Sequence, residues 1–427
     1  MRIALVIGRR ADGGTYQYGQ MVAAALASYV ARSGDDVLVV PTWDEAPDLP
    51  GTPGWPVELL AAGPTVQRLA QKALASVPGH LRLISAGRRL SGRLRAPSQP
   101  IATVDPTLNR WFTRRGIDLA IYPAPTELAF QAGIPYVAAV HDLQHRIQPE
   151  FPEVSAGGAF EGREFLFSNL IRRALRTLAD SECGAEDIVR LYELDTTAAA
   201  RVSIVPYTLP PGVASVPDEA EIARVRASYS LPERYLFYPA QFWPHKNHAR
   251  LVQALAQLGG DAADVPLVLI GSRSGDLREA TFAAVMSLAE QLGVSARVRY
   301  LGYVPDSDIA PLYAGAQALV MPTFFGPTNI PSIEAWHFGC PVITSDVRGI
   351  PEQVGDAAVL VTPSSVESIA AGIERVLSDG ALRDTLVKNG RRRIAGYPQV
   401  EFARRFGVAL DEAKAALHAA TSSGVAA

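Results

Sequence analysis

The 427-residue chain is predicted to fold as an α/β protein with two doubly wound parallel sheets, one in each half. Three observations support this prediction. The chain is too long for a single core, so two domains of roughly 200 residues each are expected. Short β-rich apolar runs alternate with helical patterns, which is typical of a parallel sheet covered on both faces. The alternation stops in a stretch rich in proline and small residues, 208–218, and then starts again.

The first half contains apolar runs that are predicted to be buried strands, at 3–7, 36–40, 119–122, 136–140 and 202–206. Helical patterns such as 17–32 and 164–179 lie between these runs. Residues 1–207 are therefore predicted to form the N-terminal domain.

The second half repeats the pattern, with predicted strands at 235–239, 266–270, 297–302, 318–322, 341–345 and 358–362. Helix-like segments such as 247–258 and 278–292 follow the strands, and residues 208–399 are assigned to this domain. The amphipathic segment 400–420 predicts a helix, so 400–427 is expected to pack back across a domain surface. Because doubly wound sheets bind ligands at the carboxyl ends of their strands, the cleft between the domains is the predicted site.

The composition, with 48% hydrophobic and 19% charged residues, is that of a globular protein, and the net charge of −3 argues against a nucleic-acid binder. The charge is uneven, because nine basic residues and one acid lie between Lys72 and Arg115. Such a cluster is suited to peripheral contact with an anionic membrane or to an anionic substrate. An ordinary solvated surface is the alternative interpretation.

The two cysteines, Cys183 and Cys340, are far apart and lack a CxxC spacing, so neither a disulfide framework nor a zinc site is expected. No window gives eighteen uninterrupted apolar residues. The sequence therefore predicts a cytoplasmic protein that is soluble or lies on the inner face of the membrane.

The loop 326–332 is predicted to connect a strand to a helix that begins near Ser332. This geometry points free backbone N–H groups and the helix dipole at an anion. Pro331 would stand in the first turn, where its missing N–H costs little, and Gly326 and Asn329 can adopt left-handed backbone angles. A diphosphate suits such a loop, although an ordinary tight turn would give the same pattern.

Further polar loops are predicted to leave the same sheet edge. One of them contains Lys246, which can neutralise a diphosphate as a point charge. The others are "IGSRSGD" (270–276) and "GYVPDSD" (302–308). Together with the loop 326–332 they predict a nucleotide pocket.

These motifs carry a resemblance. The run 301–363 resembles the donor-binding region of retaining GT-B glycosyltransferases of family 4 (group 1), and 141–151, 180–188 and 237–248 resemble other landmarks of that family in order. The likeness covers nearly the whole chain. It implies two Rossmann-like domains facing a central cleft, with the acceptor bound by the N-terminal domain and the donor by the C-terminal domain.

The resemblance also implies roles for single residues. Glu334 matches the second Glu of an E-x7-E motif that holds the ribose, and Lys246 matches the lysine at the donor diphosphate. Asn329 and Ile330 match the loop whose amides hold phosphate and sugar, and His141 matches a His that approaches the transferred sugar. The expected catalytic residues are thus His141, Lys246 and Asn329. The expected donor-binding residues are Gly13, Gly14, Gln241, Lys246, Gly271, Ser272, Val304, Gly326, Thr328, Asn329, Ile330, Pro331, Ser332 and Glu334.

Two positions depart from the family pattern. The first Glu of E-x7-E falls on Gly326, and the arginine that usually stands five residues before the lysine is Gln241. The sugar hydroxyls would then be held by the Asn329 loop, and one diphosphate charge would be lost. These departures are the reason to keep a nucleotide-sugar-binding pseudoenzyme as an alternative.

Two motifs imitate metal sites. "HDLQH" (141–145) has the spacing of a zinc motif but directly follows an apolar strand, so it is interpreted as a loop rather than a zinc helix. "DSD" (306–308) precedes an amphipathic segment, and helix N-capping is the expected explanation. No metal site is predicted.

The resemblance therefore implies a metal-independent, retaining hexosyltransferase that acts in polysaccharide biosynthesis. It would move a mannose or glucose type of sugar from a GDP- or UDP-linked donor to a glycan, lipid-linked or small-molecule acceptor. No cofactor besides this donor substrate is expected. A sugar-nucleotide epimerase of the same fold is the second alternative.

Overall fold

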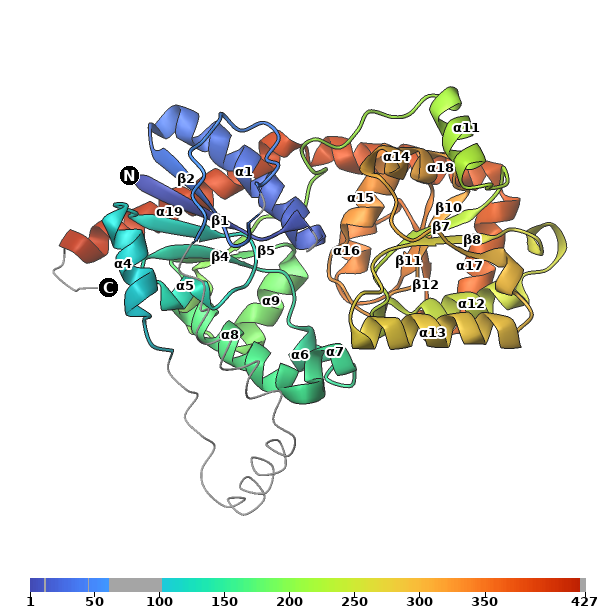
Figure 1. Cartoon of the computed structure of the whole chain (residues 1–427), viewed down its shortest axis with the longest axis horizontal. Helices are drawn as coiled ribbons and strands as arrows, with labels where there is room; N and C mark the ends of the chain where they lie inside the picture. The colour runs from blue at the N-terminus through green and yellow to red at the C-terminus, as the bar shows by residue number, and fades with distance from the viewer. Residues whose placement is uncertain (11–12, 45, 61–101, 423–427) are drawn as a thin grey trace, which may run out of the picture.

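The computed structural model describes residues 1–427 except 11–12, 45, 61–101 and 423–427. Two parallel six-stranded sheets form the centres of the two halves (Figure 1). This arrangement confirms the predicted α/β class with two doubly wound sheets. Most of the basic cluster between Lys72 and Arg115 lies outside the described residues. Among the described residues, no helix combines the length and the apolarity needed to cross a membrane.

The N-terminal sheet has the order β2-β1-β3-β4-β5-β6. Its strands are β1 (Arg2–Ile7), β2 (Asp36–Pro41), β3 (Leu119–Tyr122), β4 (Tyr136–Val140), β5 (Arg176–Ala179) and β6 (Val202–Ile204). Its helices are α1 (Gly14–Ser33), α4 (Pro106–Arg114), α5 (Leu128–Gln131), α6 (Gln144–Ile147), α7 (Pro152–Ser155), α8 (Ala159–Arg173), α9 (Glu182–Leu191) and α10 (Thr196–Ala199).

One element of this sheet was mispredicted. The expected helix 164–179 ends at Arg173, and its last residues form β5 instead. Ala174 has extended backbone angles and ends the helix, after which Leu178 and Ala179 are buried between β4 and β6. Packing between two neighbouring strands outweighs the weak local preference of such a short segment.

The C-terminal sheet has the order β12-β11-β10-β7-β8-β9. Its strands are β7 (Leu236–Pro239), β8 (Leu267–Ile270), β9 (Val298–Tyr300), β10 (Ala318–Met321), β11 (Val342–Ser345) and β12 (Val359–Val361), each within one of the predicted runs. Its helices are α11 (Glu219–Ser228), α12 (His248–Gln257), α13 (Asp276–Gln291), α14 (Asp306–Ala314), α15 (Ile330–His337), α16 (Ile350–Val354), α17 (Val366–Ser378) and α18 (Gly380–Gly396).

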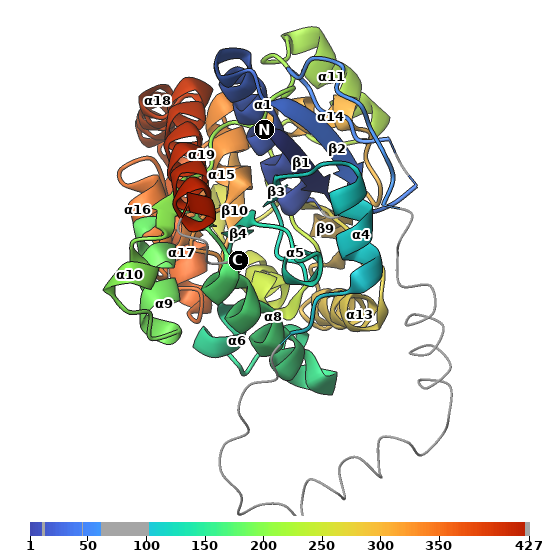
Figure 2. The same ribbon diagram turned by 90° about the vertical axis from the view of Figure 1, so that its left-hand side faces the viewer.

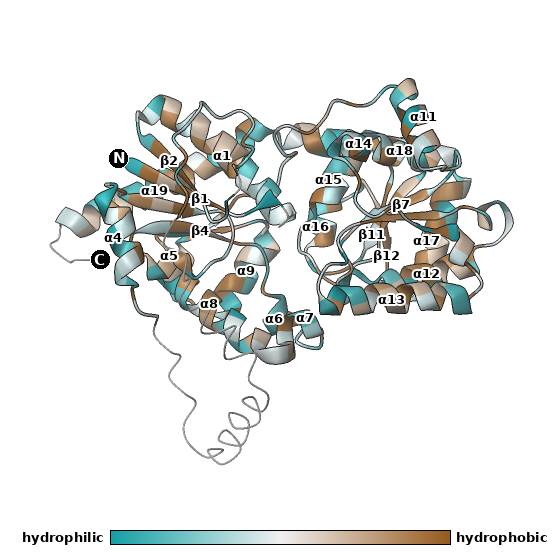
Figure 3. Cartoon of the chain, viewed as in Figure 1, coloured by the Kyte–Doolittle hydropathy of each residue, from teal (hydrophilic) through white to brown (hydrophobic). Residues whose placement is uncertain are grey.

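The strands of both sheets are apolar and the outer helix faces are polar (Figure 3). In the C-terminal sheet the strand order reverses between β7 and β10. Doubly wound sheets bind ligands at such a switch point, outside the carboxyl ends of the strands. The loops that follow β7 and β10 are therefore the positions from which ligand-binding side chains are expected.

The last helix, α19 (Gln399–Ser422), returns to the N-terminal half and runs beside α1 (Figure 2). Its residues Phe402, Phe406 and Leu410 join the core formed by α1 and the N-terminal sheet. Lys414 Nζ also bonds the Asp35 carboxylate at 2.6 Å. The C-terminal helix therefore fastens the end of the chain to the N-terminal sheet.

Candidate functional site

A cleft of about 1030 Å³ lies between the two sheets, and residues from both halves line it. Most of the predicted site residues meet there: Gly13, Gly14, His141, Gln241, Lys246, Gly271, Ser272, Val304, Thr328, Asn329, Ile330, Pro331 and Glu334. Gly326 lines an adjoining smaller chamber instead. Ser332 is fully buried in α15 and does not line the cleft.

The loop after β10 leads directly into α15, as the sequence predicted. Asn329 precedes the helix and Pro331 lies in its first turn. The backbone N–H of Asn329 donates to Gln353 Oε1 at 2.9 Å, and Gln353 Nε2 donates back to the Asn329 carbonyl at 2.8 Å. The backbone N–H of Asn329 therefore already has an acceptor. An anion at this position would instead meet the first-turn N–H groups of α15 and its helix dipole.

The side chain of Asn329 lies in the space beside the Cα atom of Gly326. Gly326 has φ 130°, and a Cβ there would lie 3.0 Å from Asn329 Oδ1 and 3.2 Å from Nδ2. Asn329 Nδ2 also donates to the Gly326 carbonyl at 3.2 Å. The side chain of Asn329 therefore fills the volume into which a side chain at 326 would project.

Lys246 ends a single 3₁₀ turn, Pro244–Lys246, in the loop after β7. The loop is fixed by Asn247, whose Nδ2 donates to the carbonyls of Pro322 and Pro363 at 2.8 Å each. Burial lowers the pKa of Lys246 to about 8, although the carboxylates of Asp142 and Glu153 act in the opposite direction. An incoming diphosphate would favour the charged ammonium and raise this pKa again.

Gln241, which lines the cleft, bonds an arginine that the sequence analysis did not identify, Arg278. Gln241 Oε1 accepts hydrogen bonds from Arg278 Nη1 at 2.8 Å and from Trp243 Nε1 at 3.0 Å. The Arg278 guanidinium also lies over the Trp243 ring, 4.7 Å from its centroid. A positive charge is thus held beside the position where the family pattern has an arginine in the loop.

Gly271 is required by a close approach of two loops. It has φ 135°, and a Cβ there would lie 2.2 Å from the carbonyl oxygen of Ala240. Any other residue would push the loops after β7 and β8 apart. The residue thus shapes the cleft wall beside Gln241.

Glu334 lies on α15 with both carboxylate oxygens engaged. Oε1 accepts from Gln17 Nε2 and Oε2 accepts from the Tyr313 hydroxyl, each at 2.9 Å. Burial raises the pKa of Glu334, although these two hydrogen bonds lower it. Gln17 belongs to α1 of the other half, so this contact spans the cleft. A diol that binds Glu334 would take the place of Gln17.

His141 follows β4 and is held in one orientation. Its Nε2 lies 2.8 Å from the Pro123 carbonyl, and its Nδ1 lies 2.9 Å from the Tyr207 hydroxyl. Burial lowers the pKa of His141, so the ring is neutral near pH 7, with Nε2–H donating to Pro123 and Tyr207 donating to Nδ1. Since both nitrogens have protein partners, His141 presents a fixed neutral ring to the cleft.

Contacts between the halves surround the cleft. His245 bonds the Glu153 carboxylate through Nδ1 at 2.6 Å and through its backbone N–H at 3.1 Å. Glu352 accepts from the backbone N–H groups of Glu182 and Cys183, at 2.9 and 3.2 Å, at the start of α9. These groups hold the two halves against each other in this structure.

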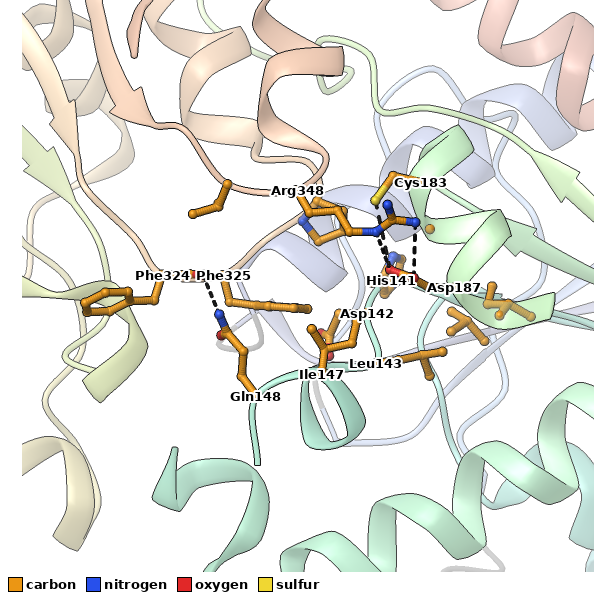
Figure 4. Close-up of a pocket in the computed structure, with 15 residues that line it drawn as sticks. His141, Asp142, Leu143, Ile147, Gln148, Cys183, Asp187, Phe324, Phe325 and Arg348 are labelled. Carbon is orange, nitrogen blue, oxygen red and sulfur yellow. Dashed lines mark hydrogen bonds and ion pairs between the residues drawn. The ribbon is translucent and has the colours of Figure 1, made fainter. Parts of the chain in front are cut away.

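A small apolar cavity lies along this boundary (Figure 4). Phe324 and Phe325 border it from one half and Ile147 from the other, and Gln148 Nε2 donates to the Phe324 carbonyl at 2.9 Å. At about 60 Å³ it has room for about two water molecules. It is too small for a sugar, so substrates must use the larger spaces beside it.

Asp180, which sequence reasoning missed, is buried after β5 and accepts a hydrogen bond from Thr328 of the other half. Burial raises the pKa of Asp180 to about 7, against hydrogen bonds from Thr328 and Ser181 that lower it. An acid whose pKa is raised by folding contributes stability at low pH, and this is lost as the pH rises through about 7. We therefore expect Asp180→Asn to raise the Tm by about 2–4 °C at pH 8.

Thermal unfolding of both proteins at pH 5 and pH 8 checks this expectation. The gain should be smaller at pH 5 than at pH 8, because at pH 5 the carboxyl is ionised in the unfolded chain but still protonated in the native protein, so the stability has been lost only in part. A lower Tm for Asp180→Asn at both pH values would contradict it.

The metal-like motifs have other structural roles. His145 is buried, stacks on the Phe167 ring and has its Nε2 3.4 Å from Glu164 Oε2. The N-cap prediction for "DSD" is wrong, because Pro305 precedes α14 and Asp308 accepts from Arg224 and Tyr229, at 2.8 and 2.9 Å. Within the described part of the chain, no three His, Cys, Asp or Glu side chains form a group that could hold a metal ion.

Residues 221–393 match the family described as glycosyl transferases group 1. O-antigen chain mannosyltransferase B of Escherichia coli is 35% identical over 173 residues, which are 40% of this chain and 44% of that protein. The 2-deoxystreptamine glucosyltransferase of Streptomyces kanamyceticus is 25% identical over 269 residues, 62% of this chain and 66% of that protein. The chain thus spans less than half the length of the first of these relatives.

Solved structures resemble the chain over nearly its whole length. Sucrose-phosphate synthase from Thermosynechococcus elongatus has a TM-score of 0.69 and 22% identity, covering 97% of this chain and 100% of that one. HepE from Anabaena, in complex with UDP-glucose, has a TM-score of 0.67 and 18% identity, and the match covers 96% of this chain and 99% of that one. These similarities confirm the predicted GT-B fold.

Proposed function

We propose that the protein transfers a hexose from a nucleotide-diphosphate sugar to an acceptor, because its residues 221–393 match the family described as glycosyl transferases group 1. One observation carries the proposal. Lys246, the start of α15 and Glu334 line the same cleft of about 1030 Å³. A cation and a helix N-terminus suit a diphosphate, and a carboxylate suits the two hydroxyls of a ribose.

The proposed donor is a GDP- or UDP-linked mannose or glucose. Support for mannose comes from the relative named O-antigen chain mannosyltransferase B, and support for UDP-glucose from the ligand named in the HepE structure. The proposed acceptor is a glycan, lipid-linked or small-molecule hydroxyl. Polysaccharide biosynthesis and a cytoplasmic location, with peripheral contact to an anionic membrane, remain part of the proposal.

The proposed reaction breaks the bond between the anomeric carbon and the diphosphate. Lys246 and the helix dipole of α15 stabilise the negative charge that develops on the departing diphosphate, and Arg278 adds charge from behind Gln241. These groups would thus stabilise the leaving diphosphate, as a metal ion does in other enzymes. The acceptor oxygen would bond the anomeric carbon on the face from which the diphosphate leaves, and its proton would pass to the departing phosphate oxygen, so the sugar would be transferred with retention.

Closure of the cleft would protect the donor from water. The Glu153–His245 contact, which does not involve the proposed donor-binding residues, joins the halves beside it. Excluding water strengthens the charge interactions at the diphosphate and limits hydrolysis.

Incubation with a panel of GDP- and UDP-linked mannose and glucose tests the function. We expect one donor to be consumed, slowly alone and faster with added sugar glycosides, and nuclear magnetic resonance of the product to show a retained anomer. Change of the sugar while it remains on the nucleotide would instead show an epimerase. Binding of a nucleotide sugar without any turnover would show a pseudoenzyme.

A further inference from the structure

Beyond Lys246, the cleft continues along the loops after β8 and β9, the strands that follow β7 in the order of the sheet. Arg273 from the loop after β8, Glu279 from the first turn of α13 and Tyr303 from the loop after β9 line this part of the cleft. The diphosphate and the ribose of the proposed donor are assigned to other groups. These three side chains are therefore available to its remaining part, the base.

A base joined to a ribose at Glu334 would reach these side chains. Glu334 accepts a hydrogen bond from the Tyr313 hydroxyl at 2.9 Å. Tyr313 belongs to α14, the helix that directly follows the loop after β9. The ribose would thus lie beside that loop, and Arg273 and Glu279 line the same space.

Arg273 and Glu279 form a loose ion pair in the wall of the cleft. Arg273 Nη1 and Glu279 Oε1 lie 3.3 Å apart, and the two side chains are 46% and 53% exposed. The guanidinium lies over the Phe282 ring, 4.6 Å from its centroid, and 5.9 Å from the centroid of the Tyr300 ring. An ion pair this exposed adds little to stability, and its long contact leaves both groups with capacity for further hydrogen bonds.

A guanidinium beside a carboxylate matches the hydrogen-bonding edge of guanine. That edge presents one acceptor, O6, beside two donors, N1–H and N2–H. An arginine commonly bonds O6 of guanine, and a carboxylate can accept from two donors at once. Uracil instead presents one donor between two acceptors, so one oxygen of the carboxylate would face an oxygen of uracil. The pair therefore suits guanine better than uracil.

We propose that Arg273 and Glu279 recognise guanine, with Arg273 donating to O6 and Glu279 accepting from N1–H and N2–H. This inference rests on the proposed function and narrows its donor to a GDP-linked sugar. Tyr303, which is 89% exposed beside the same space, offers a ring on which any base can stack. The choice of base thus depends on the ion pair, and above all on the carboxylate of Glu279.

Titration calorimetry with GDP, inosine diphosphate and UDP tests this inference, because inosine diphosphate is GDP without the N2 amino group. We expect the native protein to bind GDP about tenfold more tightly than inosine diphosphate, since one hydrogen bond to a charged group is lost, and more tightly than UDP by at least as much. Glu279→Ala should bind GDP and inosine diphosphate equally. Arg273→Met should weaken both alike, because both carry O6. Glu290→Ala, the same change at an exposed position of the same helix, is the matched control and should keep the native preference.

Inorganic pyrophosphate separates the possible failures, because it has no base. Its affinity should be unchanged in all three variants, which also shows that they fold. Guanine recognition is overturned if the native protein binds UDP as tightly as GDP, if Glu279→Ala still prefers GDP over inosine diphosphate, or if Arg273→Met binds both like the native protein. In each of these cases the binding of a nucleoside diphosphate would leave the proposed function standing. Failure of the native protein to bind any of the three nucleotides would contradict the proposed function itself.

Discussion

Lys246→Ala is expected to lower kcat/KM for sugar transfer by about 10³-fold, the cost of removing one charge that stabilises the transition state. Lys246 is fixed beside the start of α15 by the Asn247 hydrogen bonds to Pro322 and Pro363. Its ammonium would meet the diphosphate most strongly as the sugar departs. Steady-state kinetics with the preferred nucleotide sugar measure the loss, and Lys388→Ala, an exposed lysine of the same half, is the matched control.

The pH dependence of nucleotide binding gives this prediction a second readout. Since the pKa of Lys246 is lowered to about 8, the free protein loses this charge as the pH rises through about 8. A diphosphate prefers the charged form, so the affinity for a nucleoside diphosphate should fall above that pH. Lys246→Ala should show no such fall. An identical pH profile in both proteins would contradict the role given to Lys246.

Glu334→Ala is expected to weaken binding of the nucleoside diphosphate by about 10- to 100-fold, because hydrogen bonds to a charged carboxylate are among the stronger ones. The carboxylate of Glu334 accepts from Gln17 and Tyr313, and in the proposed complex the ribose would take the place of Gln17. Titration calorimetry measures the change, and Glu290→Ala on the exposed face of α13 is the control.

Inorganic pyrophosphate distinguishes the ribose role from the diphosphate role, because it lacks the ribose. Its affinity should survive Glu334→Ala and fall in Lys246→Ala. If Glu334→Ala weakened pyrophosphate and nucleotide equally, Glu334 would act through the shape of the loop after β10 rather than through the ribose.

The elements that the sequence predicted well are those with strong local patterns. The six apolar runs of the second half became β7 to β12, and the segments that follow β7 and β10 brought Gln241, Lys246 and Glu334 to one cleft. Parallel strands end at a common sheet edge, so a run of strands is enough to group the loops that follow them. The strand β5 was not predicted, because Arg176–Ala179 is short and follows a helix almost directly.

The missed residues act across the boundary between the halves. Gln17, Glu153 and Asp180 bond Glu334, His245 and Thr328, each from more than 90 positions away along the chain, with separations of 317, 92 and 148 residues. No periodicity or motif encodes such pairs, because they depend on how two finished domains dock. Arg278 was not identified for a related reason, because its hydrogen bond to Gln241 becomes visible only in the folded structure.

The structure changes the prediction of which backbone N–H groups would hold the donor. The resemblance implied that the Asn329 amide holds the donor, but Gln353 already occupies that N–H at 2.9 Å. In the proposed complex the dipole of α15 and its first-turn N–H groups, which have no acceptor within the helix, would then bind the anion. The side chain of Asn329 remains a candidate for the sugar, because it fills the space that Gly326 leaves open.

Calorimetric titration of the native protein with GDP and UDP, beside GMP and UMP, tests the central claim most directly. A cleft built for a diphosphate between Lys246, α15 and Glu334 should bind one of the two diphosphates and bind its monophosphate much more weakly. Equal affinity for the diphosphate and the monophosphate, or no heat with either diphosphate, would contradict the donor site described for this cleft.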